Sequence, residues 1–231
     1  MQIDALLFDK DGTLFEFAAT WEAWAQAFLM RAAEGDRAQA VRAGDAIGFD
    51  LNTRSFSPAS VAIAGTPAEI ADALLHEFPA HSATSLIAMI NEEATLAPQC
   101  EAVPLNDFLT GLRGRGLRLG VATNDNEAPA LAHLETSGVV DLFDFIAGSD
   151  SGFGAKPSPG QPLAFADRLG IAPHRIAMVG DSLHDLIAGQ AAGMVTLGVL
   201  TGMASEADLW PHATEVFPDI GHIPDWLDGR A

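Results

Sequence analysis

Short apolar runs that end in polar or glycine-rich residues recur along this 231-residue chain. The first is Ala5-Leu6-Leu7-Phe8, which leads directly into Asp9. Similar runs follow at 117–122, 143–147, 176–179 and 195–199. Runs this short and apolar are typical of strands buried on both faces of a parallel sheet. Helical stretches lie between most of them, so the sequence predicts an α/β fold, a doubly wound parallel sheet with helices around it.

Polar residues follow each of the predicted strands. In an open parallel sheet, ligands bind beyond the carboxyl ends of the strands. The segments at those ends are Asp9, Thr123-Asn124, Gly148-Ser149-Asp150, Gly180-Asp181 and Leu200-Thr201-Gly202. A functional site is therefore expected at the edge of the sheet where these segments meet.

Residues 15–98 interrupt the alternation and contain no convincing strand pattern. Apolar residues recur there at the spacing of amphipathic helices. The stripes are Trp21, Trp24, Ala25, Phe28 and Leu29; Ile70, Leu74 and Phe78; and Leu86, Ile87 and Ile90. We interpret the aromatic stripe as core rather than as a ligand cage. The pattern predicts an inserted helical cap domain at 15–98 and a core domain made of 1–14 and 99–231.

The charge balance excludes several classes of partner. The chain has 12 basic and 31 acidic residues, a formal net charge of −19. Nucleic acids and anionic membranes are bound through clustered Lys and Arg, so both are poor partners. There is no 18-residue apolar span, no pattern of a signal peptide, and one cysteine, Cys100. We expect a cytoplasmic monomer or homodimer that acts on a small molecule.

The first predicted strand leads into Asp9-Lys10-Asp11-Gly12-Thr13. Side chains two apart on an extended chain share a side, so Asp9 and Asp11 can face one cleft while Lys10 points away from both. Adjacent carboxylates repel unless a cation lies between them, and Mg²⁺ prefers carboxylates, waters and phosphate oxygens. Gly12 permits a tight turn whose N–H groups can face an anion. Alone, the segment also fits a solvated turn or a calcium loop.

Four ordered motifs resemble those of the haloacid dehalogenase superfamily. The matched segments are Phe8-Asp9-Lys10-Asp11-Gly12-Thr13-Leu14, Val121-Ala122-Thr123-Asn124, Gly154-Ala155-Lys156-Pro157 and Gly180-Asp181-Ser182-Leu183-His184-Asp185. They span nearly the whole chain, and each follows a predicted strand or lies in the loop beyond one. The chain looks most like the phosphoglycolate phosphatase-like members, which carry a helical cap. The resemblance implies a Rossmann-like core and Mg²⁺-dependent phosphoryl transfer.

The resemblance also implies catalytic roles. Asp9 would attack phosphorus and form an aspartyl-phosphate. Asp11 would protonate the leaving oxygen and then deprotonate the attacking water. Lys156 would offset negative charge in the transition state. Thr123 would offer its hydroxyl to a phosphate oxygen.

Binding roles follow from the same match. Phosphate would also meet the backbone N–H groups of Lys10, Gly12 and Asn124. Mg²⁺ would be held by Asp9, Asp181 and the backbone carbonyl of Asp11. We expect Asp185 to orient Lys156 or a metal-bound water. The seven histidines show no zinc-ligand spacing, and His184 is the one beside the acidic pair.

Asp11 distinguishes among related reactions. Dehalogenases of the superfamily lack this second aspartate, and cation pumps carry threonine there in Asp-Lys-Thr-Gly-Thr. Asp11 therefore favours hydrolysis of a phosphate monoester. A phosphomutase of the β-phosphoglucomutase type would keep all four motifs and is the second hypothesis. A phosphonate hydrolase would need a cap lysine, which residues 15–98 lack, and a non-enzymatic binding protein should have lost a catalytic position.

Substrate choice is expected to lie in the cap. Trp21, Trp24, Arg42 and Arg54 are candidates for facing the cleft. Arg54 could pair with a substrate carboxylate or second phosphate, although a solvated surface arginine is the simpler interpretation. The sequence does not name the small phosphorylated metabolite. Phosphoglycolate is the guess based on the family, and sugar phosphates and other small monoesters stay open.

Overall fold

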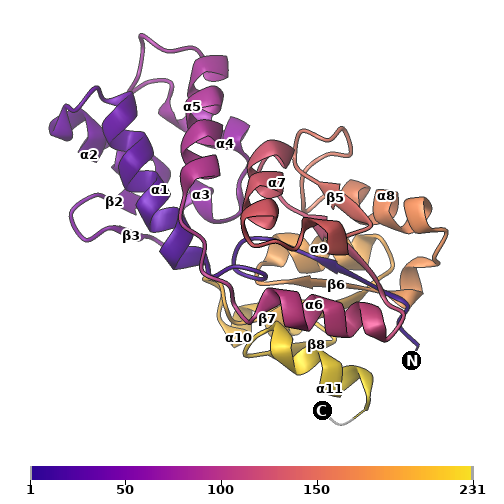
Figure 1. Cartoon of the computed structure of the whole chain (residues 1–231). Coiled ribbons are helices and arrows are strands. Elements are labelled where there is room, and N and C mark those ends of the chain that lie inside the picture. Colours follow the sequence, from indigo (N-terminus) through magenta and orange to yellow (C-terminus); the bar gives the residue numbers. More distant parts are fainter. Residues whose placement is uncertain (1, 230–231) are drawn as a thin grey trace.

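The computed structural model describes residues 2–229 and contains a six-stranded parallel sheet with the strand order β5-β4-β1-β6-β7-β8 (Figure 1). The strands are β1 (Ala5–Phe8), β4 (Arg118–Ala122), β5 (Phe145–Ala147), β6 (Ile176–Gly180), β7 (Val195–Val199) and β8 (Glu215–Phe217). The first strand of the chain lies between β4 and β6, where the strand order reverses. Ligands bind at such a reversal in open α/β sheets.

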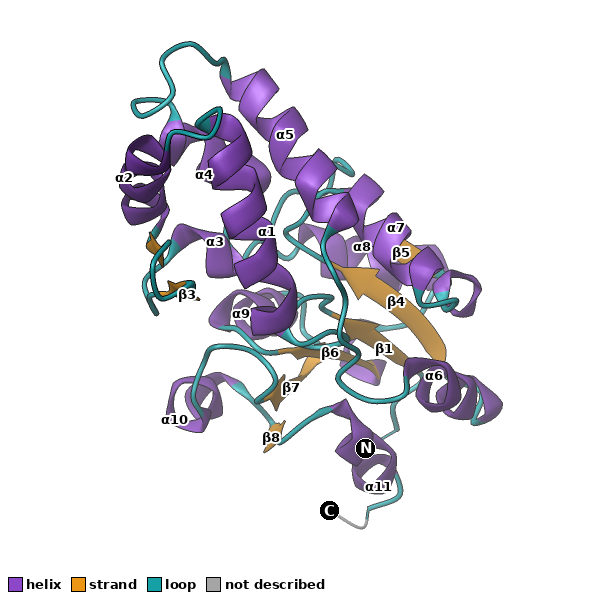
Figure 2. Ribbon diagram, turned by 60° about the vertical axis from the view of Figure 1, so that its left-hand side comes forward, coloured by secondary structure: helices purple, strands orange, loops and turns teal. Residues whose placement is uncertain are grey.

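Helices cover both faces of this sheet (Figure 2). The helices after the cap are α6 (Leu105–Gly114), α7 (Glu127–Thr136), α8 (Gly160–Leu169), α9 (Leu183–Ala191), α10 (Glu206–Leu209) and α11 (Ile223–Leu227). Along β1, Leu6 and Phe8 join the cluster that includes α6 and α11, whereas Leu7 joins Phe165 of α8 on the other face. Alternate side chains of a strand point to opposite faces, so the one short apolar run of β1 packs against the helices on both sides of the sheet. The predicted doubly wound fold is confirmed.

Residues 15–98, which we call the cap, form a helical body at one end of the molecule (Figure 1). Its helices are α1 (Phe17–Ala32), α2 (Arg37–Ile47), α3 (Val61–Ala64), α4 (Pro67–Leu74) and α5 (Ala83–Leu96). A hydrophobic cluster from Phe17 to Ala94 belongs to the cap alone. This separate cluster supports our proposal that 15–98 is one domain and that 1–14 with 99–231 is the other. Residues 1, 230 and 231 at the ends of the proposed core domain lie outside the described residues.

The apolar stripes predicted for the cap form its interior. Trp24 is 1% exposed, its indole N–H donates to the Ile90 carbonyl at 3.1 Å, and its ring stacks on Phe28 with centroids 5.4 Å apart. The hydrogen bond joins α1 to α5. Within residues 2–229, no helix has the length and apolar character needed to cross a membrane.

Two strand features differ from the sequence prediction. In the cap, β2 (Phe49–Asp50) and β3 (Ser55–Phe56) form an antiparallel pair where we expected no strand. Each strand has two residues, which is too short to display alternation. Their rings pack together, with the centroids of Phe49 and Phe56 4.7 Å apart. The short edge strand β8 was also missed, because its buried side chain, Phe217, is flanked by only partly buried neighbours.

Candidate active site

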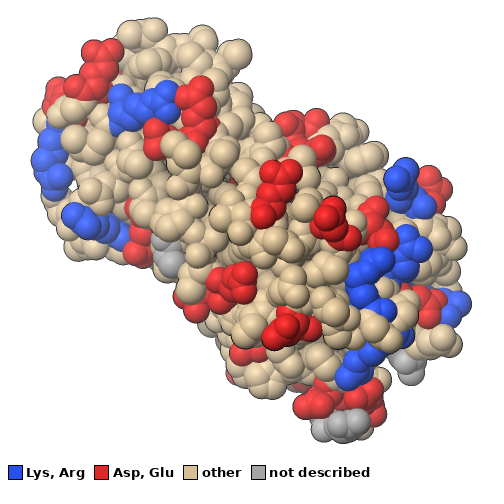
Figure 3. Space-filling view, viewed as in Figure 1, with Lys and Arg blue, Asp and Glu red and all other residues tan. Residues whose placement is uncertain are grey.

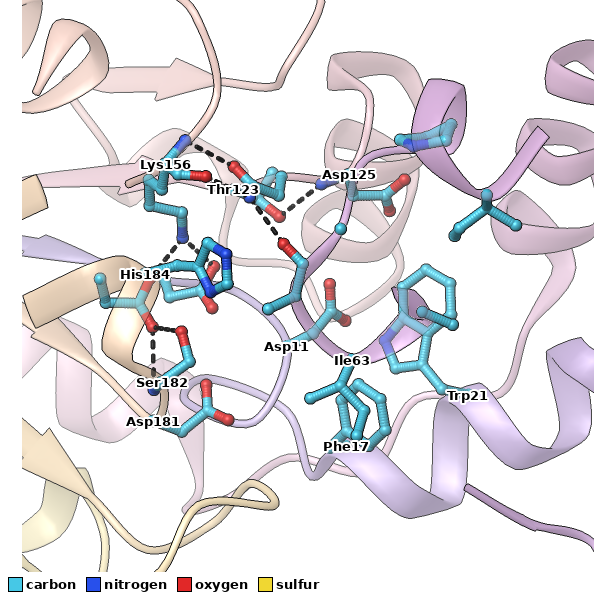
Figure 4. Close-up of a pocket in the computed structure, with 18 of the residues that line it drawn as sticks. Asp11, Phe17, Trp21, Ile63, Thr123, Asp125, Lys156, Asp181, Ser182 and His184 are labelled. Carbon is cyan, nitrogen blue, oxygen red and sulfur yellow. Dashed lines mark hydrogen bonds and ion pairs between the residues drawn. The ribbon is translucent and has the colours of Figure 1, made fainter. Parts of the chain in front are cut away.

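The four motifs converge on one cleft between the cap and the carboxyl edge of the sheet (Figure 4). Asp9 follows β1, Thr123 follows β4 and Asp181 follows β6. Lys156 lies in the loop between β5 and α8. All four line this cleft, as do Asp11, Asn124 and Asp185. The parallel sheet therefore brings together side chains that are far apart in the sequence.

Lys156 lies between two carboxylates. Its Nζ is 2.7 Å from Asp9 Oδ1 and 2.6 Å from Asp185 Oδ1. Burial alone would lower the pKa of Lys156, but the Asp185 and Asp9 carboxylates outweigh it and raise the pKa above its ordinary value. The other Asp185 oxygen accepts hydrogen bonds from the Ser182 N–H at 3.0 Å and hydroxyl at 2.6 Å. Asp185 therefore holds Lys156 in place and also caps α9.

A cluster of buried carboxylates could hold a divalent metal. Oxygens of Asp9, Asp181 and Asp185 lie within 4.8 Å of one another. Burial and then the Asp185 charge raise the pKa of Asp9 to about 7. Burial, followed by the charges of Asp185 and Asp9, raises the pKa of Asp181 well above its ordinary value. Both Asp185 oxygens are already bonded, one to Lys156 and the other to Ser182, whereas the bonds of Asp9 to Lys156 and to the Lys10 N–H both use Oδ1. Asp9 and Asp181 are therefore the better candidate ligands, and hard oxygen donors suit Mg²⁺.

Two glycines allow the backbone to approach Asp181. At Gly12, where φ is +77°, an added Cβ would lie 2.4 Å from Asp181 Cγ. At Gly202, it would lie 1.7 Å from Asp181 Oδ2. The Thr201 hydroxyl donates to the Gly12 carbonyl at 2.6 Å, which ties the loop after β7 to the first motif. Side chains at either glycine would displace this carboxylate, a role of Gly202 that the sequence did not reveal.

Two backbone amides are less available than predicted. The Gly12 N–H donates to the Phe15 carbonyl at 2.7 Å, which closes the turn after β1. The Lys10 N–H donates to Asp9 Oδ1 at 2.7 Å. The prediction that these groups face an anion is therefore not met in this conformation. Lys10 and Gly12 shape the turn and hold Asp9 instead.

The Lys10 side chain does not point away from Asp11. It is fully buried, and its Nζ lies 2.7 Å from both carboxylate oxygens of Asp11, 3.0 Å from His133 Nδ1 and 3.5 Å from Asp125 Oδ2. The prediction was wrong because alternation requires an extended chain. Here the backbone turns back after β1, and the Leu14 and Phe15 N–H groups both donate to the Lys10 carbonyl.

Asp125 and His133 were missed as parts of this network. Burial raises the pKa of Asp125 to about 6 despite the nearby Lys10 charge. His133 Nε2 lies 2.7 Å from the Ala94 carbonyl, which can only accept, so Nε2 carries the hydrogen and Nδ1 accepts from Lys10. Burial and then the Lys10 charge lower the pKa of His133 to about 4. The neutral ring thus links the end of cap helix α5 to Lys10.

Asn124 joins the cap to the Lys156 loop. Its Nδ2 donates to the carbonyls of Ala64, at 2.7 Å, and Lys156, at 2.8 Å, while its Oδ1 accepts from the Lys156 N–H at 2.8 Å. The sequence indicated only a backbone role for this residue. Next to it, the Thr123 hydroxyl accepts from the Asp125 N–H at 3.1 Å, and its own hydrogen can be donated into the cleft.

The predicted cap arginines are not at the cleft. Arg54 is exposed on the β2–β3 turn, with φ of +58°, and Arg42 pairs with Glu77. Trp24 lies in the cap interior. Trp21 is the one of these four candidates that lines the cleft, and His184 lines it from the core. Arg54 lies on a turn, whereas the other three candidates lie on helices, and the sequence pattern did not show which of these side chains face the cleft.

A family model for haloacid dehalogenase-like hydrolases matches residues 3–193. The chain belongs to the haloacid dehalogenase-like hydrolase family. The predicted resemblance is confirmed, and the matched range contains every motif residue described above.

Relatives within this family carry different activities. A phosphoglycolate phosphatase of Rhodospirillum rubrum is 33% identical over 96% of this chain and 90% of its own length. The pyrophosphatase PpaX of Bacillus pumilus is 37% identical, but over 46% of this chain and 49% of its own. The structure of a β-phosphoglucomutase from Clostridium difficile superposes with a TM-score of 0.67 and 18% identity, covering 99% of this chain and 98% of its own. At that identity, the superposition shows the fold alone.

The buried His133 predicts a pH dependence of stability. Its pKa is about 4 in the folded chain and 6.5 for a free ring, so the unfolded chain binds more protons between these values. The contribution of His133 to stability should therefore be lost as the pH drops from 6.5 towards 4, whereas Asp9 and Asp125, whose folded pKa values are raised, contribute in the opposite direction. His133→Gln keeps one donor and one acceptor but does not titrate, so its unfolding free energy in urea should rise relative to that of the unmodified chain as the pH drops across this interval.

The matched control for this measurement is His76→Gln, because the His76 side chain is 66% exposed. This variant should keep the pH slope of the unmodified chain. Equal slopes for the unmodified chain and His133→Gln would contradict the assignment of a buried neutral His133.

Proposed function

We propose that this chain is a Mg²⁺-dependent phosphatase that hydrolyses a small phosphate monoester through an aspartyl-phosphate on Asp9. The observation that carries the proposal is the meeting of Asp9, Lys156 and Asp181 in one cleft, with Lys156 Nζ 2.7 Å from Asp9. Membership of the hydrolase family supports it, as does the phosphatase activity named for the relative from Rhodospirillum rubrum.

The donor set supports the choice of metal. Asp9, Asp181 and the backbone carbonyl of Asp11 would hold Mg²⁺, which would neutralise phosphate oxygens and the repulsion between the carboxylates. Asp181 is 3% exposed, and its pKa is raised, so its charged form needs a nearby cation. Thr13 contributes one long hydrogen bond, at 3.4 Å from Asp181 Oδ1.

The first half of the reaction transfers phosphate to the protein. An Asp9 oxygen attacks phosphorus in line, and the bond from phosphorus to the ester oxygen breaks. The electron pair of that bond goes to the ester oxygen, which takes a proton from Asp11 and leaves as an alcohol. Lys156, held by Asp185, offsets charge on the phosphoryl oxygens, and the Thr123 hydroxyl donates to one of them.

The second half releases phosphate. Asp11, now a carboxylate, takes a proton from a water molecule as the water oxygen attacks phosphorus. The bond between phosphorus and Asp9 breaks, which regenerates the Asp9 carboxylate and releases inorganic phosphate. Asp11 ends protonated, ready for the next substrate. Lys10 contacts both Asp11 oxygens and so orients this group for both steps.

Phosphomutase activity is the second candidate, because a mutase uses the same four motifs. The structural likeness to the β-phosphoglucomutase supports a shared fold and says nothing further about activity. The two functions differ in their product, since a phosphatase releases inorganic phosphate and a mutase returns a phosphorylated isomer. A non-enzymatic binding role is disfavoured because all four motif positions keep their functional groups.

Asp9→Asn is expected to abolish phosphate release. An amide is a far weaker nucleophile than a carboxylate, and the substitution barely changes volume. Phosphate release with Mg²⁺ measures the effect, using Asp167→Asn, an exposed position on α8, as the control that keeps full activity. Unchanged turnover in Asp9→Asn would rule out the proposed nucleophile.

Asp181→Asn is expected to raise the Mg²⁺ concentration for half-maximal activity by about tenfold or more, since it removes a charged metal ligand. The substitution also removes a buried negative charge, so the metal-free variant should unfold no more easily than the unmodified chain. Titration of activity with Mg²⁺ after chelation, together with urea unfolding, checks both. An unchanged Mg²⁺ requirement would argue against Asp181 as a ligand.

A further inference from the structure

The cap contributes an apolar wall to the cleft. Its larger members are Phe17, Trp21, Ile63, Pro67, Ile70 and Ile90. In Figure 4, Phe17, Ile63 and Trp21 lie together on one side of the site, opposite Lys156. Among the described residues, no ionisable side chain of the cap lines the cleft. The part of a substrate beyond its phosphate therefore meets hydrophobic surface.

The arginines of the cap are engaged elsewhere or exposed. Arg31 pairs with Glu92 and Glu93, Arg37 donates to Asn52, and Arg42 pairs with Glu77. In Figure 3 the basic side chains of the cap appear at its outer end, away from the core. A carboxylate on the substrate would find none of these cations at the cleft.

The core side of the cleft is rich in negative charge. Five carboxylates line it: Asp9, Asp11, Asp125, Asp181 and Asp185. The one Lys or Arg among the described lining residues is Lys156, which is already bonded to two of them. The bound metal and Lys156 would be needed by the transferring phosphate. Apart from His184, the described lining residues offer a second anionic group no further side chain that can carry a positive charge, and that group would face carboxylates, which is unfavourable.

Trp21 offers one polar contact within the apolar wall. Its side chain is nearly buried, and its indole N–H has no hydrogen-bond partner within residues 2–229. The ring is fixed between Phe17 and Trp24, with centroids at 6.3 Å and 5.0 Å. In Figure 4 its nitrogen lies on the side of the ring towards Asp11. Buried indole N–H groups normally have an acceptor, so an acceptor on the substrate would satisfy this one.

We propose that the cleft selects phosphate monoesters of uncharged alcohols with an apolar, preferably aromatic, body. The body packs on the cap wall, and one of its oxygens accepts a hydrogen bond from Trp21. This inference rests on the proposed phosphatase activity and narrows its substrate class. It differs from the substrate named for the relative from Rhodospirillum rubrum, because phosphoglycolate carries a carboxylate, for which the described lining residues hold no Lys or Arg besides Lys156.

The test compares benzyl phosphate with phosphoglycolate, both esters of primary alcohols, in the presence of Mg²⁺. The expected kcat/KM is at least about tenfold higher for benzyl phosphate, since each buried methylene contributes about fourfold. A higher kcat/KM for phosphoglycolate overturns the inference and leaves the phosphatase proposal standing. No phosphate release from either ester or from p-nitrophenyl phosphate overturns the phosphatase proposal and the inference with it.

A second test of the proposed substrate class adds a positive charge to the cap wall. Ile63→Arg places a cation on the wall and should raise the ratio of kcat/KM for phosphoglycolate over benzyl phosphate by about 10- to 100-fold, the value of a charge-assisted hydrogen bond. Ile63→Met, which keeps the wall apolar, should retain the original preference. An unchanged ratio in Ile63→Arg, with p-nitrophenyl phosphate still hydrolysed, would contradict the placement of the leaving group against this wall.

The role of Trp21 is tested with methoxy-substituted benzyl phosphates, which carry an acceptor on the ring. Trp21→Phe keeps an aromatic wall and removes the N–H. In the unmodified enzyme, kcat/KM for the best methoxy ester should exceed that for benzyl phosphate by about 2- to 10-fold. This difference in kcat/KM should disappear in Trp21→Phe. An advantage that survives in Trp21→Phe would contradict the hydrogen bond from Trp21.

Discussion

Repulsion among buried carboxylates is the constraint on which this site depends. Asp9, Asp181 and Asp185 place oxygens within 4.8 Å of one another, and all three residues are buried. Lys156 offsets part of this charge through Asp9 and Asp185, whereas the one side-chain hydrogen bond to Asp181 within residues 2–229 is the long one from Thr13. The raised pKa values of Asp9 and Asp181 follow from this arrangement. A divalent cation removes the repulsion and makes the same oxygens useful for binding phosphate.

The fold makes this concentration of charge possible. The central strand β1 carries Asp9 to the point where the strand order reverses, and its neighbours β4 and β6 bring Thr123 and Asp181. Two buried lysines form ion pairs with different carboxylates. Lys156 pairs with Asp9, whereas Lys10 pairs with Asp11 and is linked through His133 to the end of cap helix α5. Asp11, the proposed acid–base group, is thus connected to the part of the chain that joins the cap to the core.

Much of this arrangement was predictable from the sequence. The apolar runs predicted β1, β4, β6 and β7, because strands buried on both faces consist almost entirely of apolar residues. Parallel pairing then brought the motifs to one edge. Other features depend on turns and packing that have no period. The direction of Lys10 follows from a backbone turn, and the place of Arg54 follows from the turn of a hairpin whose strands have two residues each. Asp125 and His133 carried no motif of their own.

The most direct test of the central claim is to locate the phosphoryl group during turnover. Asp11→Asn should slow the hydrolysis of the intermediate, because the attacking water loses its general base. Acid quenching of this variant during turnover with Mg²⁺ and p-nitrophenyl phosphate, followed by peptide mass spectrometry, should find a phosphoryl group on Asp9. A phosphoryl group on another residue, or turnover with an Asp9 that is never phosphorylated, would contradict the account.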